Sequence, residues 1–140
     1  MKTEKSCGAV VFTRKNGQIK YLIELYKKQY YGFPKGHFSP NLSEKKCAIK
    51  EIKKEIGLDV VLIDGFVTCD SYPLFFEGLP DVTKTIVYFL AEFEDQIPEV
   101  LDSEISKIYL MTYEEAIKVL NFESTKRIIT EAHKFLKQYY

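Results

Sequence analysis

The sequence has no tryptophan and little cysteine. Its three cysteines, Cys7, Cys47 and Cys69, are odd in number and form no C-x-x-C pair, so we expect neither a disulfide framework nor a zinc site. Long apolar runs are also missing, because no stretch approaches the about 18 uninterrupted apolar residues that a membrane-spanning helix needs. These absences predict reduced, mostly buried thiols in a cytoplasmic protein without a membrane partner.

An excess of charge of either sign is missing as well. The 20 lysines and arginines balance the 20 aspartates and glutamates, so no global positive field attracts duplex nucleic acid. What is present is a hydrophobic content of 46% beside 29% charged residues, which is typical of a globular domain. At 140 residues we expect a single domain over residues 1–140. No residue pattern defines an oligomeric state.

Five runs of β-branched and aromatic residues predict strands. Between the first two, the Asn16-Gly17 pair favours the positive φ angles of a tight hairpin turn. The third and fourth are joined by residues 77–82, where glycine and proline mark a turn. The Gly- and Pro-rich segment 29–41 is too irregular for a helix, and we interpret it as a functional loop. The five runs are residues 6–13, 19–27, 59–76, 83–94 and 107–112.

Helical patterns predict three helices, at residues 43–56, 113–120 and 124–139. In the first, Ser43 is placed to cap the N-terminus and Gly57 to end the helix. Strands and helices do not alternate regularly, so we predict an α/β fold with a mixed β-sheet in an α/β/α sandwich. The expected core positions are Ala48, Ile49, Ile52 and Ile56 in the first helix and Ile128, Ile129, Ala132 and Leu136 in the last.

Three glutamates share one stripe of the first helix. Glu51 and Glu55 lie one turn apart, and Glu44 returns to the same side two turns earlier. One interpretation is an ordinary solvated helix face. The other is a site for Mg²⁺ or Mn²⁺, which prefer carboxylate oxygens; the Gly-rich segment before the helix and the glycine after it favour this second interpretation. A cation held there would bridge phosphate oxygens and activate a water, which suits hydrolysis of a pyrophosphate linkage.

The stretch from Gly36 to Leu58 resembles the Nudix box, whose pattern is Gly, five residues, Glu, seven residues, then Arg-Glu-apolar-x-Glu-Glu-x-Gly-apolar. The departures are Leu42 and Lys54, which stand where the pattern has glutamate, and Lys50, which replaces its arginine. The matching positions are Gly36, Glu51, Ile52, Glu55, Gly57 and Leu58.

Further segments are similar to the diadenosine-tetraphosphate hydrolase branch of the Nudix family, in order and at fitting separations. They are CGAVVF, FPKGH, TKTIVYFLAEF, LDSEI and FESTKRIITEAHKFL. The resemblance covers nearly the whole chain and implies the Nudix fold. It also implies a metal-dependent hydrolase of nucleoside polyphosphates, above all of a dinucleoside polyphosphate such as diadenosine tetraphosphate. Nucleoside triphosphates and RNA 5′ ends are the alternative expected substrates.

The resemblance also implies residue roles. In the family, residues that match Glu51 and Glu55, with a further acid that matches Glu104, bind Mg²⁺ or Mn²⁺ and support catalysis, and the carbonyl that matches Gly36 helps. Each candidate also has an ordinary explanation, as an exposed loop acid, a surface lysine, a histidine bonded to backbone or a packed aromatic ring. The expected substrate-binding residues are Lys35 and Lys84 at the polyphosphate, His37 and Lys54 at phosphate, and Tyr31 and Phe122 against a base.

The missing carboxylates leave three alternatives open. A protonated lysine cannot ligate a cation and repels one at short range, so Lys54 is expected to lower the number or affinity of bound metals. Glu51, Glu55 and Glu104 can still hold one metal while Lys54 binds phosphate, which gives a slow or narrowly specific enzyme. The site can instead bind nucleotide without cleaving it, as a sensor or interaction module. In the third alternative, Glu44 takes over part of the lost ligation.

Overall fold

The structure is a computed structural model that describes residues 2–74 and 78–139. β1 (Lys2–Lys15) lies inside one mixed sheet, where it pairs in parallel with β7 (Leu79–Glu92) and antiparallel with β2 (Gln18–Tyr26). The remaining strands are β3 (Tyr31–Gly32), β4 (Lys35–His37), β5 (Val61–Leu62), β6 (Thr68–Leu74) and β8 (Ile105–Met111), and the helices are α1 (Glu44–Ile56), α2 (Tyr113–Val119) and α3 (Glu123–Tyr139).

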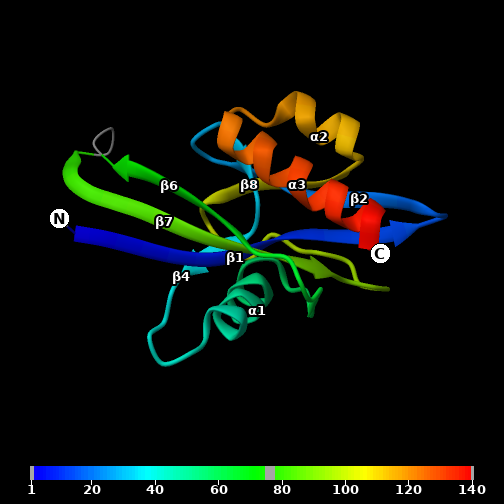
Figure 1. Cartoon of the computed structure of the whole chain (residues 1–140), viewed down its shortest axis with the longest axis horizontal. Helices are drawn as coiled ribbons and strands as arrows, with labels where there is room; N and C mark the ends of the chain where they lie inside the picture. Colours follow the sequence, from blue (N-terminus) through cyan, green and yellow to red (C-terminus); the bar gives the residue numbers. More distant parts are fainter. Residues whose placement is uncertain (1, 75–77, 140) are drawn as a thin grey trace.

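Helices cover both faces of the sheet. Figure 1 shows α1 on one side and α2 and α3 on the other. Successive side chains of a strand point to opposite faces, and the two cores divide accordingly. Cys7, Ala9 and Val11 of β1 pack in the core with α1, whereas Val10 and Phe12 pack in the core with α2 and α3. The predicted mixed sheet between helical layers is confirmed.

The ends of α1 are as the sequence predicts. Ser43 Oγ accepts a hydrogen bond from the backbone N–H of Lys46 at 3.1 Å. At the other end, Gly57 adopts a left-handed φ of 74° and its N–H donates to the carbonyl of Lys53 at 2.9 Å. A residue with a Cβ is strained in that conformation, so glycine suits the position. The hairpin between β1 and β2 is also confirmed, with φ of 52° at Asn16 and 76° at Gly17.

The buried face of α1 differs from the prediction at one position. Ala48, Ile52 and Ile56 are fully buried, but Ile49 is 37% exposed, so its assignment to the core is wrong. Cys47 and Glu55 are buried instead. The helix packs against β4 as well as β1, which turns its inner face toward the side that carries Glu55. An acid therefore lies where an aliphatic residue was expected.

Two segments differ from their predicted form. Residues 29–41 are not all loop, because β3 and β4 lie within them and β4 pairs with β1. The predicted strand 59–76 is divided into β5 and β6, since Gly65 between them has φ of 94° and turns the chain. Residues 75–77, at the end of that run and the start of the predicted turn, lie outside the described residues.

The helices near the C-terminal end of the chain agree closely with the prediction. α2 begins with a reciprocal capping box, in which Thr112 Oγ1 accepts from the N–H of Glu115 and Glu115 Oε1 accepts from the N–H of Thr112. In α3 the four predicted core residues are buried, together with Thr125. Within residues 2–74 and 78–139, no helix has the length and apolar character needed to cross a membrane.

Candidate active site

Two buried acids lie together between β2 and α1. Glu55 is 8% exposed, Glu24 is 0% exposed, and among the described residues Glu55 Oε1 and both carboxyl oxygens of Glu24 have no hydrogen-bond partner. Two ionised carboxylates have no donor between them, so they repel each other unless a proton or a cation lies between them. Burial first, and then the neighbouring charge of Glu55, raise the pKa of Glu24 well above its ordinary value. Burial raises the pKa of Glu55 as well.

Lys35 of β4 brings a positive charge to this acid pair. Its Nζ donates a hydrogen bond to the Tyr26 hydroxyl at 3.2 Å and lies 4.5 Å from the centroid of the Tyr26 ring. Burial first, and then the charge of Lys84, lower the pKa of Lys35, whereas the charges of Glu24 and Glu55 oppose the shift. Lys35 therefore lies within electrostatic range of both acids and of a second lysine.

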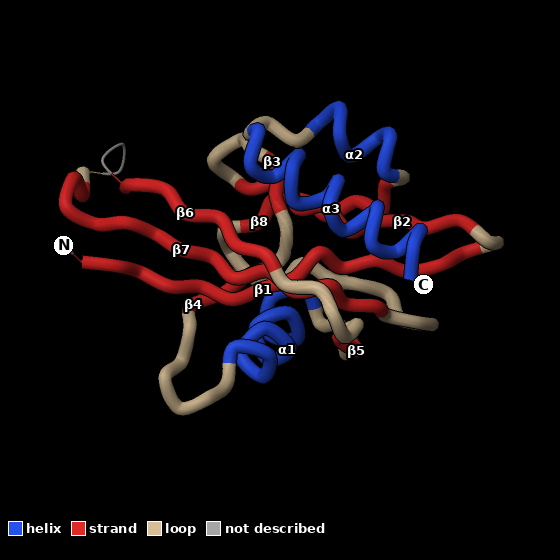
Figure 2. Tube along the Cα trace, in the orientation of Figure 1, coloured by secondary structure: helices blue, strands red, loops and turns tan. Residues whose placement is uncertain are grey.

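Gly36 allows β4 to pass close to α1. A Cβ at this position would lie 2.6 Å from Cγ and Cδ of Glu51, so any larger residue would displace the Glu51 side chain. The thiol of Cys47 on α1 donates to the carbonyl of His37 at 3.3 Å, which also holds β4 to the helix. Figure 2 shows β4 leading into the loop before α1. The predicted partners Gly36 and Glu51 are thus in contact.

The loop before β8 holds two acids, Asp102 and the predicted ligand Glu104. The side chain of Glu104 is exposed, and its main chain is held by a bond from its N–H to Asp102 Oδ1 at 2.8 Å and by a bond from the N–H of Lys27 to its carbonyl at 2.9 Å. The charge of Asp102 acts on both Lys35 and Glu55. Glu104 as a metal ligand stays a prediction, and Asp102 is the nearer acid in electrostatic terms.

An aromatic pocket with a volume of about 510 Å³ opens beside Lys35. This volume is within the roughly 300–1,000 Å³ of small-molecule sites. The rings of Tyr30 and Phe122 meet at its edge with centroids 5.7 Å apart and an interplanar angle of 65°. The lining consists of Tyr26, Tyr30, Tyr31, Gly32 and Lys35, the β6 residues Asp70 to Leu74, Ile86 and Tyr88 of β7, and Phe122, Ser124 and Thr125 at the start of α3.

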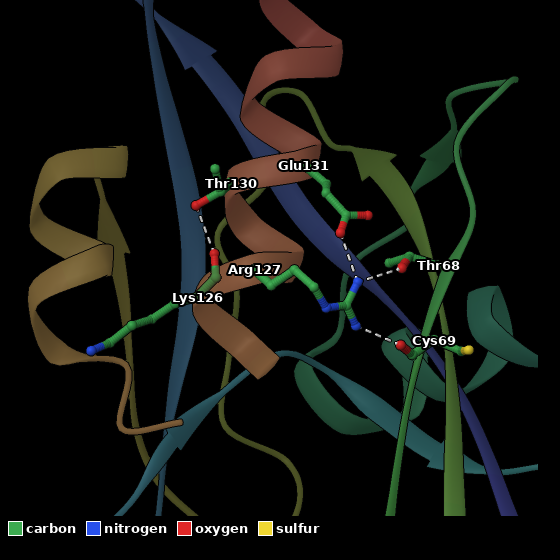
Figure 3. Close-up of polar contacts among 6 residues, drawn as sticks. All are labelled: Thr68, Cys69, Lys126, Arg127, Thr130 and Glu131. Atoms are coloured by element: carbon green, nitrogen blue, oxygen red, sulfur yellow. Dashed lines mark hydrogen bonds and ion pairs between the residues drawn. The ribbon is translucent and has the colours of Figure 1, made fainter. Parts of the chain in front are cut away.

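Arg127 joins α3 to β6, as Figure 3 shows, and both elements carry residues that line this pocket. From α3, its guanidinium donates to Thr68 Oγ1 at 3.1 Å and to the carbonyl of Cys69 at 2.8 Å, both on β6. It also forms an ion pair of 2.7 Å with Glu131, one turn along the same helix. Because β6 and the start of α3 both line the pocket, these contacts set their separation.

The other predicted residues lie in varied surroundings. Lys84 is on β7 opposite Glu4 of β1 and near enough to Lys35 to affect its pKa. His37 and Lys54 are exposed on β4 and α1. The structure thus brings Lys35, Tyr31 and Phe122 to one pocket and Glu55 next to it. Glu44, considered as a replacement ligand, forms an ion pair with Lys5 at 2.6 Å.

The acids present suit a divalent cation, although the described residues contain no group of three His, Cys, Asp or Glu side chains placed to hold a metal. The fit rests on the orphaned oxygens of Glu24 and Glu55, because a buried carboxylate without a partner costs several kcal/mol unless a cation or proton compensates it. Mg²⁺ commonly binds one or two carboxylates and completes its shell with water and substrate phosphate. Hard oxygen ligands are thus available at this acid pair.

Two of these residues were missed in the sequence. Glu24 interrupts the apolar run YLIELY, and an acid in such a strand was a signal that its position is special. Asp102 is two residues before Glu104 in the segment LDSEI, where sequence alone does not decide which carboxylate acts on Lys35 and Glu55. Both depend on contacts between elements that are distant along the chain.

Comparison with known proteins shows the family of this chain. The sequence model of the NUDIX domain matches residues 3–133. The asymmetrical bis(5'-nucleosyl)-tetraphosphatase of Sus scrofa is 28% identical to the chain over 94% of this chain and 95% of its own length. The enzyme of the same name from Caenorhabditis elegans is 26% identical, over 94% of this chain and 96% of its own length.

Solved structures show the same fold. A binary complex of C. elegans Ap4A hydrolase superposes with a TM-score of 0.85 at 21% identity, covering 97% of this chain and 99% of that chain. The NUDIX domain of Shewanella oneidensis NrtR, solved with ADP ribose, gives a TM-score of 0.75 at 12% identity, covering 97% of this chain and 90% of that one. With the family pattern matched from β1 into α3, the chain belongs to the Nudix family.

Proposed function

We propose that the protein hydrolyses a dinucleoside polyphosphate such as diadenosine tetraphosphate, in a reaction that depends on Mg²⁺ or Mn²⁺. One observation carries the proposal: Lys35 lies between an aromatic pocket and the buried acid pair. A nucleotide has the same order of parts, with a flat base followed by an anionic phosphate chain. The full-length similarity to asymmetrical bis(5'-nucleosyl)-tetraphosphatases supports the same substrate class.

In this proposal the base occupies the aromatic pocket. Tyr30, Tyr31 and Phe122 provide rings on which a purine can stack, and stacking of a base on an aromatic ring contributes about 1–3 kcal/mol. The polyphosphate then extends past Lys35 toward Glu55. Lys35 and Lys84 neutralise its negative charge, which stabilises the developing charge on the leaving group.

Hydrolysis requires a water held in line with the bridging P–O bond. The water oxygen forms a bond to one phosphorus and gives up a proton to solvent, the bridging P–O bond breaks, and the leaving nucleotide keeps the electron pair of that bond. A divalent cation, when bound, lowers the pKa of its water and draws charge from the phosphate oxygens. Glu51, Glu55 and Glu104, with the carbonyl of Gly36, remain the predicted metal ligands, and the same three glutamates remain the predicted catalytic residues. Glu55 is buried, which limits the access of bulk water to its carboxylate, whereas Lys35 is only partly buried and faces the pocket.

The alternative is a Nudix domain that binds nucleotide without cleaving it. Lys54 and Leu42 stand where the box has glutamate, and Lys54 is exposed on α1 beside the acids. A related fold, the NrtR NUDIX domain, was solved with ADP ribose bound. We favour the hydrolase because Glu55, Lys35 and the aromatic pocket are arranged together.

The test is incubation of the purified protein with a panel of nucleoside polyphosphates, with and without Mg²⁺ or Mn²⁺. We expect metal-dependent release of nucleotide from diadenosine tetraphosphate that falls about 100-fold in Glu55→Gln. Glu94→Gln, an exposed acid beyond β7, is the matched control and should retain activity. Tight nucleotide binding with no product under any metal would overturn the hydrolase and favour the binding module.

A further inference from the structure

Glu24 is an acid inside an apolar face of the sheet. Leu22 and Tyr26, two residues before and after it on β2, both pack in the core on the α1 side. Alternate residues of a strand share a face, so Glu24 also points toward α1, where it meets Glu55. Its neighbours on the adjacent strands are Gly32 of β3 and Ile108 of β8.

The surroundings of Glu24 leave its negative charge without a direct partner. Neither carboxyl oxygen has a hydrogen-bond partner within the part of the chain that the structure describes. Lys35 is in electrostatic range, but its Nζ donates to the Tyr26 hydroxyl rather than to Glu24. Buried charges in proteins are normally paired or bind a metal. The partner of Glu24 is therefore a proton or a bound cation.

We propose that Glu24 and Glu55 together bind the divalent cation, so that Glu24 supplies from β2 a carboxylate that the Nudix box lacks at Lys54. This inference rests on the proposed function, since that function places a cation at Glu55. Two carboxylates are enough for Mg²⁺ or Mn²⁺ when water and substrate phosphate complete the shell. The exposed edge of Glu55 gives the cation access to the pair.

The proposed metal site also gives the two acids and Lys35 separate roles. A cation held by Glu24 and Glu55 compensates both carboxylates and removes their mutual repulsion. Lys35 is then not needed as their counter-charge and is available to the phosphate chain from its position at the pocket. A purely structural role for Glu24, as a protonated acid bonded to Glu55, would not require any metal.

The first experiment measures binding of Mn²⁺ alone, by calorimetry and by electron paramagnetic resonance, to the parent protein and to Glu24→Gln. We expect at least a tenfold loss of Mn²⁺ affinity, together with loss of the rise in unfolding temperature that Mn²⁺ gives the parent. Glu92→Gln, a buried glutamate on β7, is the matched control and should bind Mn²⁺ as the parent does. Parent-like Mn²⁺ affinity in a folded Glu24→Gln overturns the inference.

The second experiment needs no variant. Crystals of the parent protein with Mn²⁺ should give an anomalous peak at coordination distance from a Glu24 oxygen, about 2.0–2.2 Å. A peak ligated by Glu55 and Glu51, with Glu24 outside the coordination shell, overturns the inference even if Glu24→Gln does not fold.

The experiments distinguish failure of this inference from failure of the proposed function. Product release by the parent, with Glu24 absent from the metal shell, removes the inference and leaves the hydrolase. Mn²⁺ bound by Glu24 and Glu55 in a protein that cleaves no nucleoside polyphosphate removes the hydrolase and leaves the metal site.

Discussion

Arg127 on α3 and Cys69 on β6 are joined by a hydrogen bond of 2.8 Å from the guanidinium to the backbone carbonyl. They are 58 residues apart in the chain. With the bond to Thr68, this contact fixes the edge of α3 against β6. The pocket is lined by the next residues of β6 and by the first turn of α3, so its width depends on a side chain outside it.

Replacing Arg127 with alanine should therefore loosen the pocket without changing the surroundings of Glu24 and Glu55. We expect the KM for a nucleoside polyphosphate to rise several-fold with kcat nearly unchanged, and the free energy of unfolding to fall by about 1 kcal/mol. Steady-state kinetics and urea unfolding provide the two measurements. Lys134→Ala, an exposed residue of the same helix, is the control. A loss confined to kcat would contradict this explanation.

Truncation of Phe122 should weaken base binding. Its side chain is 51% exposed and meets Tyr30 at the pocket edge. In Phe122→Ala we expect about a fivefold loss of affinity for an adenine nucleotide, because a partly exposed stacking ring contributes about 1 kcal/mol. Calorimetry with AMP measures this loss, and Ile97→Ala, at an 87% exposed position outside the pocket, serves as the control. Equal affinities in the two variants would argue against stacking at Phe122.

Lys54→Glu restores the carboxylate of the family pattern. Position 54 adjoins Glu55 and is exposed, so the new charge should attract a cation where lysine repels one. We expect about a tenfold increase in hydrolysis at low Mn²⁺ and a smaller increase at saturation. Lys46→Glu makes the same charge change in the first turn of the helix and should leave the rate unaltered. A fall in rate for Lys54→Glu would show instead that the lysine takes part in the chemistry.

The metal-free protein should lose stability as pH rises. The pKa of Glu24 is raised in the folded protein above the ordinary value of 4.5, so the folded state holds its proton more tightly than the unfolded chain does. The stability from this group is complete below about pH 4.5 and decreases as pH rises through the raised pKa. Glu24→Gln lacks this group. Its free energy of unfolding, relative to the parent, should increase with pH.

Urea unfolding in EDTA, from about pH 5 to about pH 8, tests this dependence. The difference between Glu24→Gln and the parent is the measured quantity, because carboxyl groups distant from Glu24 contribute equally to both proteins, and only Glu24 and its neighbour Glu55 titrate differently. The same difference for Glu92→Gln provides a reference for replacing a buried glutamate. A difference for Glu24→Gln that is flat with pH would mean that Glu24 has an ordinary pKa.

Local sequence signals predicted the elements that they control directly. Ser43 and Gly57 set the ends of α1, and Asn16-Gly17 sets the first hairpin, because capping and positive φ depend on a few adjacent residues. Ile49 was misassigned since helical periodicity gives the width of a buried face but not its centre. That centre depends on how α1 packs against β4 as well as β1.

The candidate site was predictable where the family resemblance indicated its residues, including Phe122, which is distant in the chain from the other residues of the pocket. Lys35, Gly36, Glu51 and Glu55 lie close together in the chain, and the family resemblance indicated them. Glu24 lies near Glu55 only after β2 packs against α1, and no sequence pattern within either element predicts that contact. Pairing of the two acids is a result of tertiary structure.

The parallel pairing of β1 with β7 sets the time at which this site can form during synthesis. Lys2 lies opposite Val82 and Phe12 opposite Glu92, so every pair joins residues 80 positions apart. β7 must leave the ribosome before β1 can pair with it, and closing a loop of this length slows folding. The β1–β2 hairpin and α1 are synthesised earlier, but the sheet that they belong to is complete only when β7 is present. Until then, the acids and Lys35 belong to a nascent chain that has no enclosed site and is exposed to chaperones and proteases.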